Sequence, residues 1–284
     1  MTISVFTSPK ARTTFQTLYA SAFARLWPVP YTEVMLPTSY GVTRVYRSGP
    51  PSGIPFVLLP GAGGNSLMWH RHVAALAADR PVIAVDTIGE PGGSVQDRPI
   101  GGGDDLVAWL GEVLSTLDIP RAHLVGCSYG GWIALRSADR ASSISLLDPA
   151  GLGRVTPGFL AWVIAGGLAA LLPAGVRHRL AGVLHNATLR DDELMPLLRA
   201  SMGFRRRLPV PPPLTDEALR ALAGVPLLVL LGARSQLYDA NTVATRLRTL
   251  LPAARVEVVP GASHDLPVHS PDLVVDRIRT FTAS

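Results

Sequence analysis

The chain has 284 residues, of which 48% are hydrophobic and 17% charged, so it can bury a sizeable core and global disorder is excluded. A single cysteine, Cys127, excludes an intramolecular disulfide framework. The net charge of +5 comes from scattered arginines with one short run at 205–207, which we interpret as a solvated face, and we expect no nucleic-acid partner.

The first seven residues lack a basic segment followed by an apolar one, so we expect no signal peptide and predict a cytoplasmic protein. The longest uncharged stretch, 155–176, has an apolar centre at 159–172, which is shorter than the roughly 20 residues that cross a bilayer. We expect a buried or groove-lining helix there and no stable membrane insertion, with contact at a membrane surface as the lesser alternative. Association into a homo-oligomer is left open.

Apolar residues recur at helical spacing between Phe15 and Leu26, which predicts an amphipathic helix on the main body. Two strands follow at 31–37 and 41–47, separated by a polar turn. The short apolar run 56–60 is typical of a strand buried on both faces of a parallel sheet.

This run opens into a glycine-rich loop at 61–66. The loop lacks the Gly-Lys-Ser/Thr ending of a P-loop and the glycine spacing of a dinucleotide site. We therefore expect it to supply backbone N–H groups rather than to bind a phosphate. A helix is predicted at 70–78, a strand at 82–86 and an amphipathic helix at 104–117, with a glycine-rich loop at 87–98.

A tight turn then joins an apolar, strand-like run at 122–126 to a helical segment at 132–136. The turn has the pattern Gly-x-Ser-x-Gly, with Ser128 between Gly126 and Gly130. On such a strand-to-helix turn the serine is strained and its hydroxyl projects above the sheet edge. The following helix directs free N–H groups toward the serine, which favours an oxyanion beside it. The pattern indicates a nucleophile, because the flanking strand and helix count against an incidental serine.

Strand and helix alternate as far as a strand at 143–148, which predicts an α/β fold with a mostly parallel, doubly wound sheet. Residues 152 to about 222 interrupt the alternation with proline-punctuated helical sequence, which we interpret as an inserted helical cap. Strands at 226–231 and 256–259 and helices at 242–250 and 271–281 resume it. The predicted division is an N-terminal helix and first strand (1–40), a first part of the core (41–151), the cap (152–222) and a second part of the core (223–284).

The ends of the predicted parallel strands carry Ser128, Asp148, Ser235 and His264, and ligands bind at that edge in such sheets. A serine, a histidine and an acid on one rim can act as nucleophile, base and orienting group. The other histidines show no metal-binding spacing, so we expect no metal site. Asp86, also at a strand end, is interpreted as a structural loop acid.

These motifs resemble the α/β-hydrolase-fold serine hydrolases from about residue 40 to the end. Residues 126–130 match the nucleophile elbow, residues 60–63 stand where the family has its His-Gly-x-Gly oxyanion loop, and residues 261–264 match the Gly-x-x-His that carries the base. The loop at 85–94 also resembles the family's loop after strand 4.

The resemblance implies a role for each matching residue. Ser128 would be the nucleophile and His264 the base. The backbone N–H groups of Ala62 and Tyr129 would form the oxyanion hole. No metal and no organic cofactor are implied.

The acid departs from the family pattern. The family most often places it at the third residue beyond the glycine after the strand 226–231, and that residue here is Ser235. The two nearest candidates are Asp148, at the end of the preceding strand, and Asp239, which is well placed to cap a helix. We predict Asp148 as the acid and keep Asp239 as the alternative.

We therefore predict a serine hydrolase that cleaves a small to medium apolar carboxylic ester through an acyl-enzyme, with a small-molecule apolar ester as its partner. The stretch 159–172 is apolar on all sides and is expected to roof an apolar pocket. A carbon–carbon bond hydrolase or a perhydrolase would use the same residues. A non-catalytic small-molecule-binding protein with this fold is the alternative from another class, and Ser235 at the usual acid position supports it.

Overall fold

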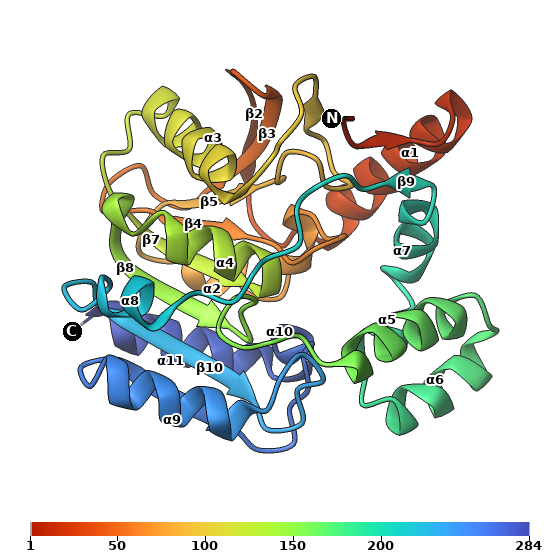
Figure 1. Ribbon diagram of the computed structural model, residues 1–284. Helices are drawn as coiled ribbons and strands as arrows, with labels where there is room; N and C mark the ends of the chain where they lie inside the picture. The colour runs from red at the N-terminus through yellow and green to blue at the C-terminus, as the bar shows by residue number, and fades with distance from the viewer. Residues whose placement is uncertain (1, 284) are drawn as a thin grey trace.

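The computed structural model describes residues 2–283, and within them a nine-stranded sheet runs through the molecule with helices on both faces (Figure 1). The strand order is β11-β10-β8-β7-β4-β5-β3-β2, with β6 paired to β3. The strands are β2 (Tyr31–Thr38), β3 (Gly41–Ser48), β4 (Phe56–Leu59), β5 (Val82–Val85), β6 (Val95–Gln96), β7 (Ala122–Cys127), β8 (Ala141–Leu147), β10 (Leu227–Gly232) and β11 (Arg255–Val259).

Strands β4, β5, β7, β8, β10 and β11 pair in parallel, whereas β3 pairs antiparallel with β2, β5 and β6. The predicted mostly parallel α/β sheet is confirmed. Its central strands are short apolar runs without alternation, because helices cover both of their faces.

Side chains of one strand point alternately into two cores. Val57 and Leu59 of β4 belong to one core, and Phe56 and Leu58 belong to the other. The first core is covered by α3 (Gly103–Thr116), α4 (Ser128–Arg136), η2 (Ala138–Arg140) and α9 (Ala240–Leu250). The second is covered by α1 (Pro9–Leu26), η1 (Ser66–Trp69), α2 (Val73–Leu76), α10 (Leu266–His269) and α11 (Pro271–Ala283).

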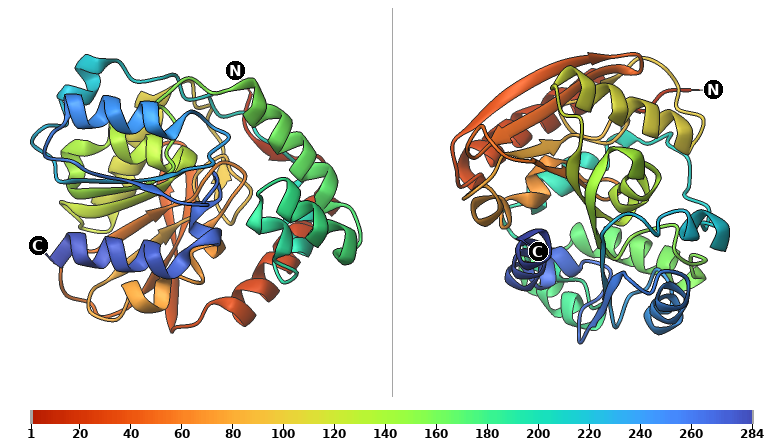
Figure 2. Two further views of the ribbon diagram at one scale, coloured as in Figure 1. Left: turned by 90° about the horizontal axis from the view of Figure 1, so that it is seen from below. Right: turned by 90° about the vertical axis from the view of Figure 1, so that its left-hand side faces the viewer.

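Residues 157–201 form helices on the side toward which the parallel strands point, at the lower right of Figure 1 and the right of the first view in Figure 2. They are α5 (Pro157–Ala170), α6 (Ala174–Val183), η3 (Ala187–Arg190) and α7 (Met195–Ser201). These helices share a small core of their own, made of Ala169, Ala170, Ala181, Leu189 and Met195.

The last part of the predicted cap lies elsewhere. The proline-rich segment 209–213 is extended, because proline cannot continue a helix, and it leads back across the molecule. The short helix α8 (Asp216–Arg220) therefore packs against α9 of the core rather than against the other cap helices.

The N-terminal segment lies against the cap. Strand β1 (Val5–Phe6) pairs antiparallel with β9 (Phe204–Arg205), and α1 contacts α7. The sequence predicted α1 but not this pairing, because two-residue strands are too short to show a period. The helix predicted at 70–78 was wrong in extent: within that range only the single turn α2 is helical, and the short helix η1 precedes it.

Across residues 2–283, no helix is both long enough and apolar enough to cross a membrane.

Candidate active site

Ser128 stands at the junction of β7 and α4 with a φ of +47°, a conformation that costs energy for a residue with a side chain. Two glycines make this tight turn possible. A Cβ on Gly126 would lie 2.5 Å from the carbonyl oxygen of Gly130, and a Cβ on Gly130 would lie 2.2 Å from that of Leu59. The turn thus forms only with glycine at both positions, and it holds the serine side chain out at the end of the strand.

His264 and Asp148 complete a hydrogen-bonded chain with Ser128. Nε2 of His264 lies 3.0 Å from Oγ of Ser128, and Nδ1 lies 2.6 Å from Oδ2 of Asp148. A carboxylate oxygen only accepts, so Nδ1 carries the ring proton and Nε2 is left to accept from the serine hydroxyl. This tautomer suits a base that removes a proton from Ser128.

Asp148 follows β8 and is fully buried, with a φ of +44°. Besides the histidine it accepts a hydrogen bond from the backbone N–H of Gly232 at 3.0 Å and from the hydroxyl of Ser235 at 2.6 Å. Ser235, the residue at the family's usual acid position, thus supports the acid from the neighbouring strand. Sequence reasoning missed this donor role, which depends on tertiary contact.

Asp239 lies outside this chain of hydrogen bonds. Its exposed carboxylate accepts from the backbone N–H of Thr242 at 2.7 Å and caps α9, and these hydrogen bonds lower the pKa of Asp239. The Asp86 carboxylate also forms its hydrogen bonds outside this chain. It is buried and accepts from the N–H groups of Ser66 at 2.8 Å and Gly93 at 2.6 Å, so it ties two loops together.

The loop at 61–64 lies beside Ser128, since a Cβ on Gly61 would come within 3.5 Å of the serine Cβ. In the described part of the chain, the N–H groups of Ala62 and Tyr129 donate none of the hydrogen bonds found. Tyr129 is in the first turn of α4, where N–H groups have no partner within the helix. Both groups are available to an oxyanion that forms on a substrate bound to Ser128.

A buried carboxylate holds the same loop. Glu90, with a side chain 1% exposed, accepts from the N–H of Gly63 at 2.9 Å. Its other oxygen lies 2.7 Å from Nε of Arg206, whose guanidinium stands 4.4 Å from the ring centre of Tyr129. Burial raises the pKa of Glu90, and Arg206 opposes that rise. The sequence analysis recognised the loop 85–94 but predicted no role for Glu90 itself, because a single acid in a loop gives no pattern from which a role can be inferred.

Helix α5 contributes two aromatic rings to the site. Phe159 and Trp162 stand edge-on to the imidazole of His264, with ring centres 5.0 Å and 6.0 Å away. The other apolar side chains of α5 correct the expectation of a buried helix. Leu160 and Leu168 among them are exposed on its outer side, because the cap is a single layer of helices there.

A cavity of about 210 Å³ adjoins the loop that carries Ala62. Its walls include Met68 from the core and Leu194 and Leu198 from the cap, so most of its lining is apolar. The ion pair of Arg71 with Asp191, 3.0 Å long, joins core to cap at the same place.

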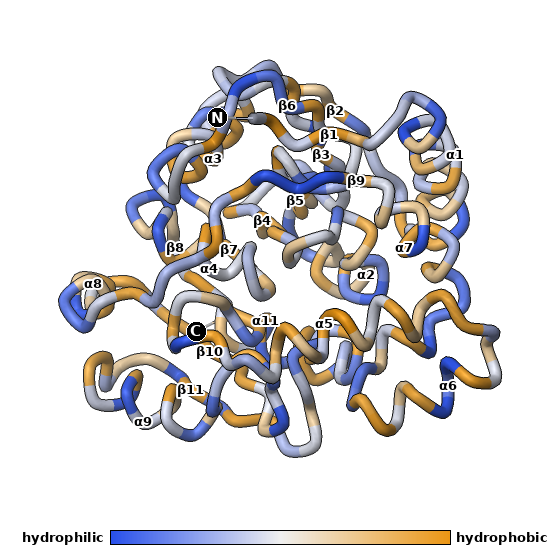
Figure 3. The backbone as a smooth tube through the Cα atoms, turned by 45° about the vertical axis from the view of Figure 1, so that its right-hand side comes forward, coloured by the Kyte–Doolittle hydropathy of each residue, from blue (hydrophilic) through white to orange (hydrophobic). Residues whose placement is uncertain are grey.

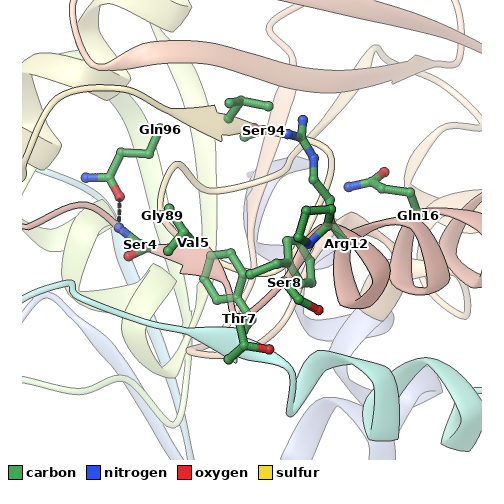
Figure 4. A pocket seen from close by; sticks show the side chains of 13 residues that line it. Ser4, Val5, Thr7, Ser8, Arg12, Gln16, Gly89, Ser94 and Gln96 are labelled. Carbon is green, nitrogen blue, oxygen red and sulfur yellow. Dashed lines mark hydrogen bonds between the residues drawn. The ribbon is translucent and has the colours of Figure 1, made fainter.

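A second cavity, of about 370 Å³, lies between the N-terminal segment and β6 (Figure 4). Its wall includes Ser4, whose N–H donates to the side chain of Gln96 at 2.9 Å, together with Arg12 and Gln16 from α1. Unlike the first cavity, which includes Ala62 in its wall, this one contains no residue of the 61–64 loop, and Ser128 and His264 also do not line it, so it is separate from the candidate site.

Cys127 precedes the serine but is buried, and burial together with the neighbouring Asp148 raises the pKa of its thiol. The thiol is therefore neutral and unreactive at ordinary pH. Between residues 2 and 283, no three His, Cys, Asp or Glu side chains gather in a way that could hold a metal ion.

Comparisons with known proteins identify the family of this chain and several similar proteins. A family model described as "Alpha/beta hydrolase family" matches residues 56–277. The chain is 32% identical to an uncharacterized carboxylesterase, nap, of Bacillus subtilis over 277 residues, which are 90% of this chain and 88% of that protein. It superposes on the crystal structure of a naproxen esterase from Bacillus subtilis with a TM-score of 0.82 and 27% identity, covering 97% of this chain and 99% of that one. The carboxylesterase CesB of the same organism gives a TM-score of 0.83 at 23% identity, covering 96% and 98%.

Proposed function

This chain belongs to the alpha/beta hydrolase family, and from that premise we propose that it is a serine carboxylesterase acting on small to medium apolar esters. The observation that carries the proposal is the hydrogen-bonded chain from Ser128 through His264 to Asp148. Relatives named as carboxylesterases, at 32% and 27% identity over most of both chains, support ester hydrolysis.

In the proposed reaction, Oγ of Ser128 attacks the ester carbonyl while its proton passes to Nε2 of His264. Asp148 holds the Nδ1 proton and stabilises the imidazolium that forms. The carbonyl oxygen becomes an oxyanion, which the N–H groups of Ala62 and Tyr129 stabilise by hydrogen bonds.

The intermediate then expels the alcohol, which takes its proton from Nε2 of His264 and leaves an acyl group on Ser128. Water attacks that acyl-enzyme and gives its proton to His264. Collapse of the second intermediate releases the carboxylic acid and returns the proton to Ser128. The cycle consumes one water and regenerates both side chains.

The cavity beside Ala62 supports an apolar substrate of limited size. About 210 Å³ is room for about seven non-hydrogen atoms at roughly 30 Å³ each. The charges of Arg71 and Asp191 neutralise each other at its wall, which favours an uncharged group. We assign the helices of residues 157–201 the role of a cap, whose Phe159 and Trp162 wall the other side of the imidazole.

A panel of p-nitrophenyl esters of increasing acyl length tests this proposal. We expect kcat/KM to rise to an acyl chain of about six to eight carbons and then to fall, since each added CH2 is buried until the cavity is full. Ser128→Ala should be inactive on every ester. A preference for charged acyl groups would contradict the assigned substrate class.

A fluorophosphonate probe separates an esterase from a binding protein of the same fold. Ser128 should displace fluoride and form one covalent adduct, seen by intact mass, and the adduct should be absent in Ser128→Ala. A wild-type protein that stays unlabelled would favour the non-catalytic alternative. A cytoplasmic location and homo-oligomer formation stay predictions from the sequence.

A further inference from the structure

Helix α5 has an inner and an outer side, and both are apolar. The inner side carries Phe159 and Trp162, which face the candidate active site. The outer side carries Leu160, Ile164 and Leu168, which follow one another at intervals of four residues and so share one face. Leu160 is 63% and Leu168 64% exposed, whereas helices that are apolar all round are ordinarily buried.

Helix α6, which contacts α5, also carries exposed apolar side chains: Val183 is 74% and Val176 is 45% exposed. We call the exposed apolar side chains of the two helices the cap apolar surface: Leu160, Val163, Ile164, Leu168, Val176 and Val183. Figure 3 shows α5 largely in orange, next to α6 on the lower right-hand side of the molecule. Contiguous exposed apolar patches mark interaction sites more often than isolated apolar residues do.

The charged residues between residues 149 and 190, the stretch that carries the cap apolar surface, are all basic. The sequence contains no aspartate or glutamate from residue 149 to residue 190, whereas Arg154, Arg179 and Arg190 in this stretch are exposed. An apolar helix face with arginines beside it is typical of a segment that lies in the plane of a membrane surface. Arginines near an anionic surface add electrostatic attraction to the apolar contact.

The carboxylates that follow this stretch do not neutralise those arginines. Asp192 is paired with Arg177 and His178 of α6. Asp191 is buried against Arg71 of the core. Glu193 is exposed and remains as one negative charge. Five arginines against three carboxylates between residues 149 and 203 leave the cap with a net charge of +2.

A second copy of the chain fits this surface less well. A twofold contact would place the cap apolar surface against itself. The arginines of the two copies would then meet without a carboxylate from residues 149–190 between them. Anionic phospholipid complements both the apolar side chains and the arginines.

We propose that the cap apolar surface docks the protein on an anionic phospholipid membrane. The leucines and valines enter the boundary between headgroups and acyl chains, and the arginines contact phosphates. Docking is peripheral, and it does not depend on the hydrolysis proposed above. It places the membrane on one side of α5 and the candidate active site on the other.

Flotation of the purified protein with vesicles tests the proposal. We expect the wild type to float with vesicles of equal parts phosphatidylglycerol and phosphatidylcholine. The bound fraction should fall about fivefold or more on phosphatidylcholine alone, and also when salt is raised from about 0.1 M to about 0.5 M. The double variant Leu160→Ser/Leu168→Ser should lose about fivefold or more of the binding.

Met35→Ser is the matched control, because Met35 is also an exposed apolar residue, at 43%, but lies on β2. It should bind like the wild type, and so should Ser128→Ala, because docking needs no chemistry. The double variant should still hydrolyse soluble p-nitrophenyl acetate, which checks that it folds. Absence of wild-type binding to phosphatidylglycerol vesicles would overturn the proposal. A dimer that the double variant abolishes, with no vesicle binding, would instead assign the surface to a second copy.

Discussion

The hydroxyl of Ser235 donates a hydrogen bond to Oδ2 of Asp148 at 2.6 Å, and the same oxygen lies 2.6 Å from Nδ1 of His264. The carboxylate is therefore supplied by the end of β8, while the residue after β10 acts as a donor to it. A polar contact of this kind fixes the direction of the carboxylate toward the imidazole.

Asp148→Asn should lower kcat by about a hundredfold or more, because an amide favours the wrong imidazole tautomer and cannot stabilise the imidazolium. Asp239→Ala should leave kcat within about twofold but cost about 1 kcal/mol of unfolding free energy, since it removes the cap of α9. Ester kinetics and urea unfolding of both variants check this pair. A folded Asp239→Ala that is nearly inactive beside an active Asp148→Asn would mean that the acid is Asp239.

Ser235→Ala should reduce kcat by a smaller factor, about three- to tenfold, while KM changes little. Asp148 then loses one donor but keeps the N–H of Gly232, at 3.0 Å, and the imidazole. Ser235→Thr keeps the hydroxyl and should recover most of the rate. Equal activity of wild type and Ser235→Ala would show that the hydrogen bond has no part in catalysis.

Glu90→Gln should lower kcat more than it raises KM, because Glu90 holds the Gly63 N–H and so the loop of the proposed oxyanion hole. We expect a fall of about tenfold in kcat and a similar loss of affinity for a trifluoromethyl ketone, which forms an oxyanion on the serine. Glu33→Gln removes a carboxylate from a half-exposed ion pair with Arg44 and is the control. If both variants change kcat and inhibitor affinity by the same small factor, Glu90 has only a structural role.

Burial lowers the pKa of the His72 imidazole to about 4, from about 6.5 in the unfolded chain. Between these values the unfolded chain binds a proton at this position that the folded chain does not, so stability rises with pH there. Acidification from about pH 6.5 to about pH 4 should therefore cost on the order of 3 kcal/mol, with no further loss from this group below that range. Urea unfolding at several pH values measures the loss, and His72→Gln should make the curve flatter. An unchanged slope in that variant would assign the pH dependence to other groups.

The sequence predicted the features whose causes are local. An unbroken apolar run indicates the buried strand at 56–59. The turn at Ser128 is indicated by glycines that no other residue could replace. Helix α1 was predicted from its spacing, and its inward residues Phe15 and Tyr19 are buried. In each case the residue pattern within a single segment is enough to predict its structure.

Other features depend on segments that are distant in the sequence. Ser235 and Asp148 are 87 positions apart and Glu90 and Arg206 are 116 apart, so neither contact follows from local pattern. The prediction that α5 is buried was wrong for a different reason. A helix that is apolar all round gives no sign of which face is inward, and the exposed row headed by Leu160 appears only once the cap is folded.

The pairing of Val5–Phe6 with Phe204–Arg205 has a consequence for recombination between relatives. The ring of Phe6 lies 4.9 Å from that of Phe204, and α1 contacts α7, so residues 5–26 and the cap fold against one another. A chimaera that takes residues 152–222 from this chain and its N-terminal segment from a relative would lose the matched contact between the two segments. The unit of exchange is accordingly discontinuous: the cap has to travel together with the N-terminal segment, although the family match begins only at residue 56.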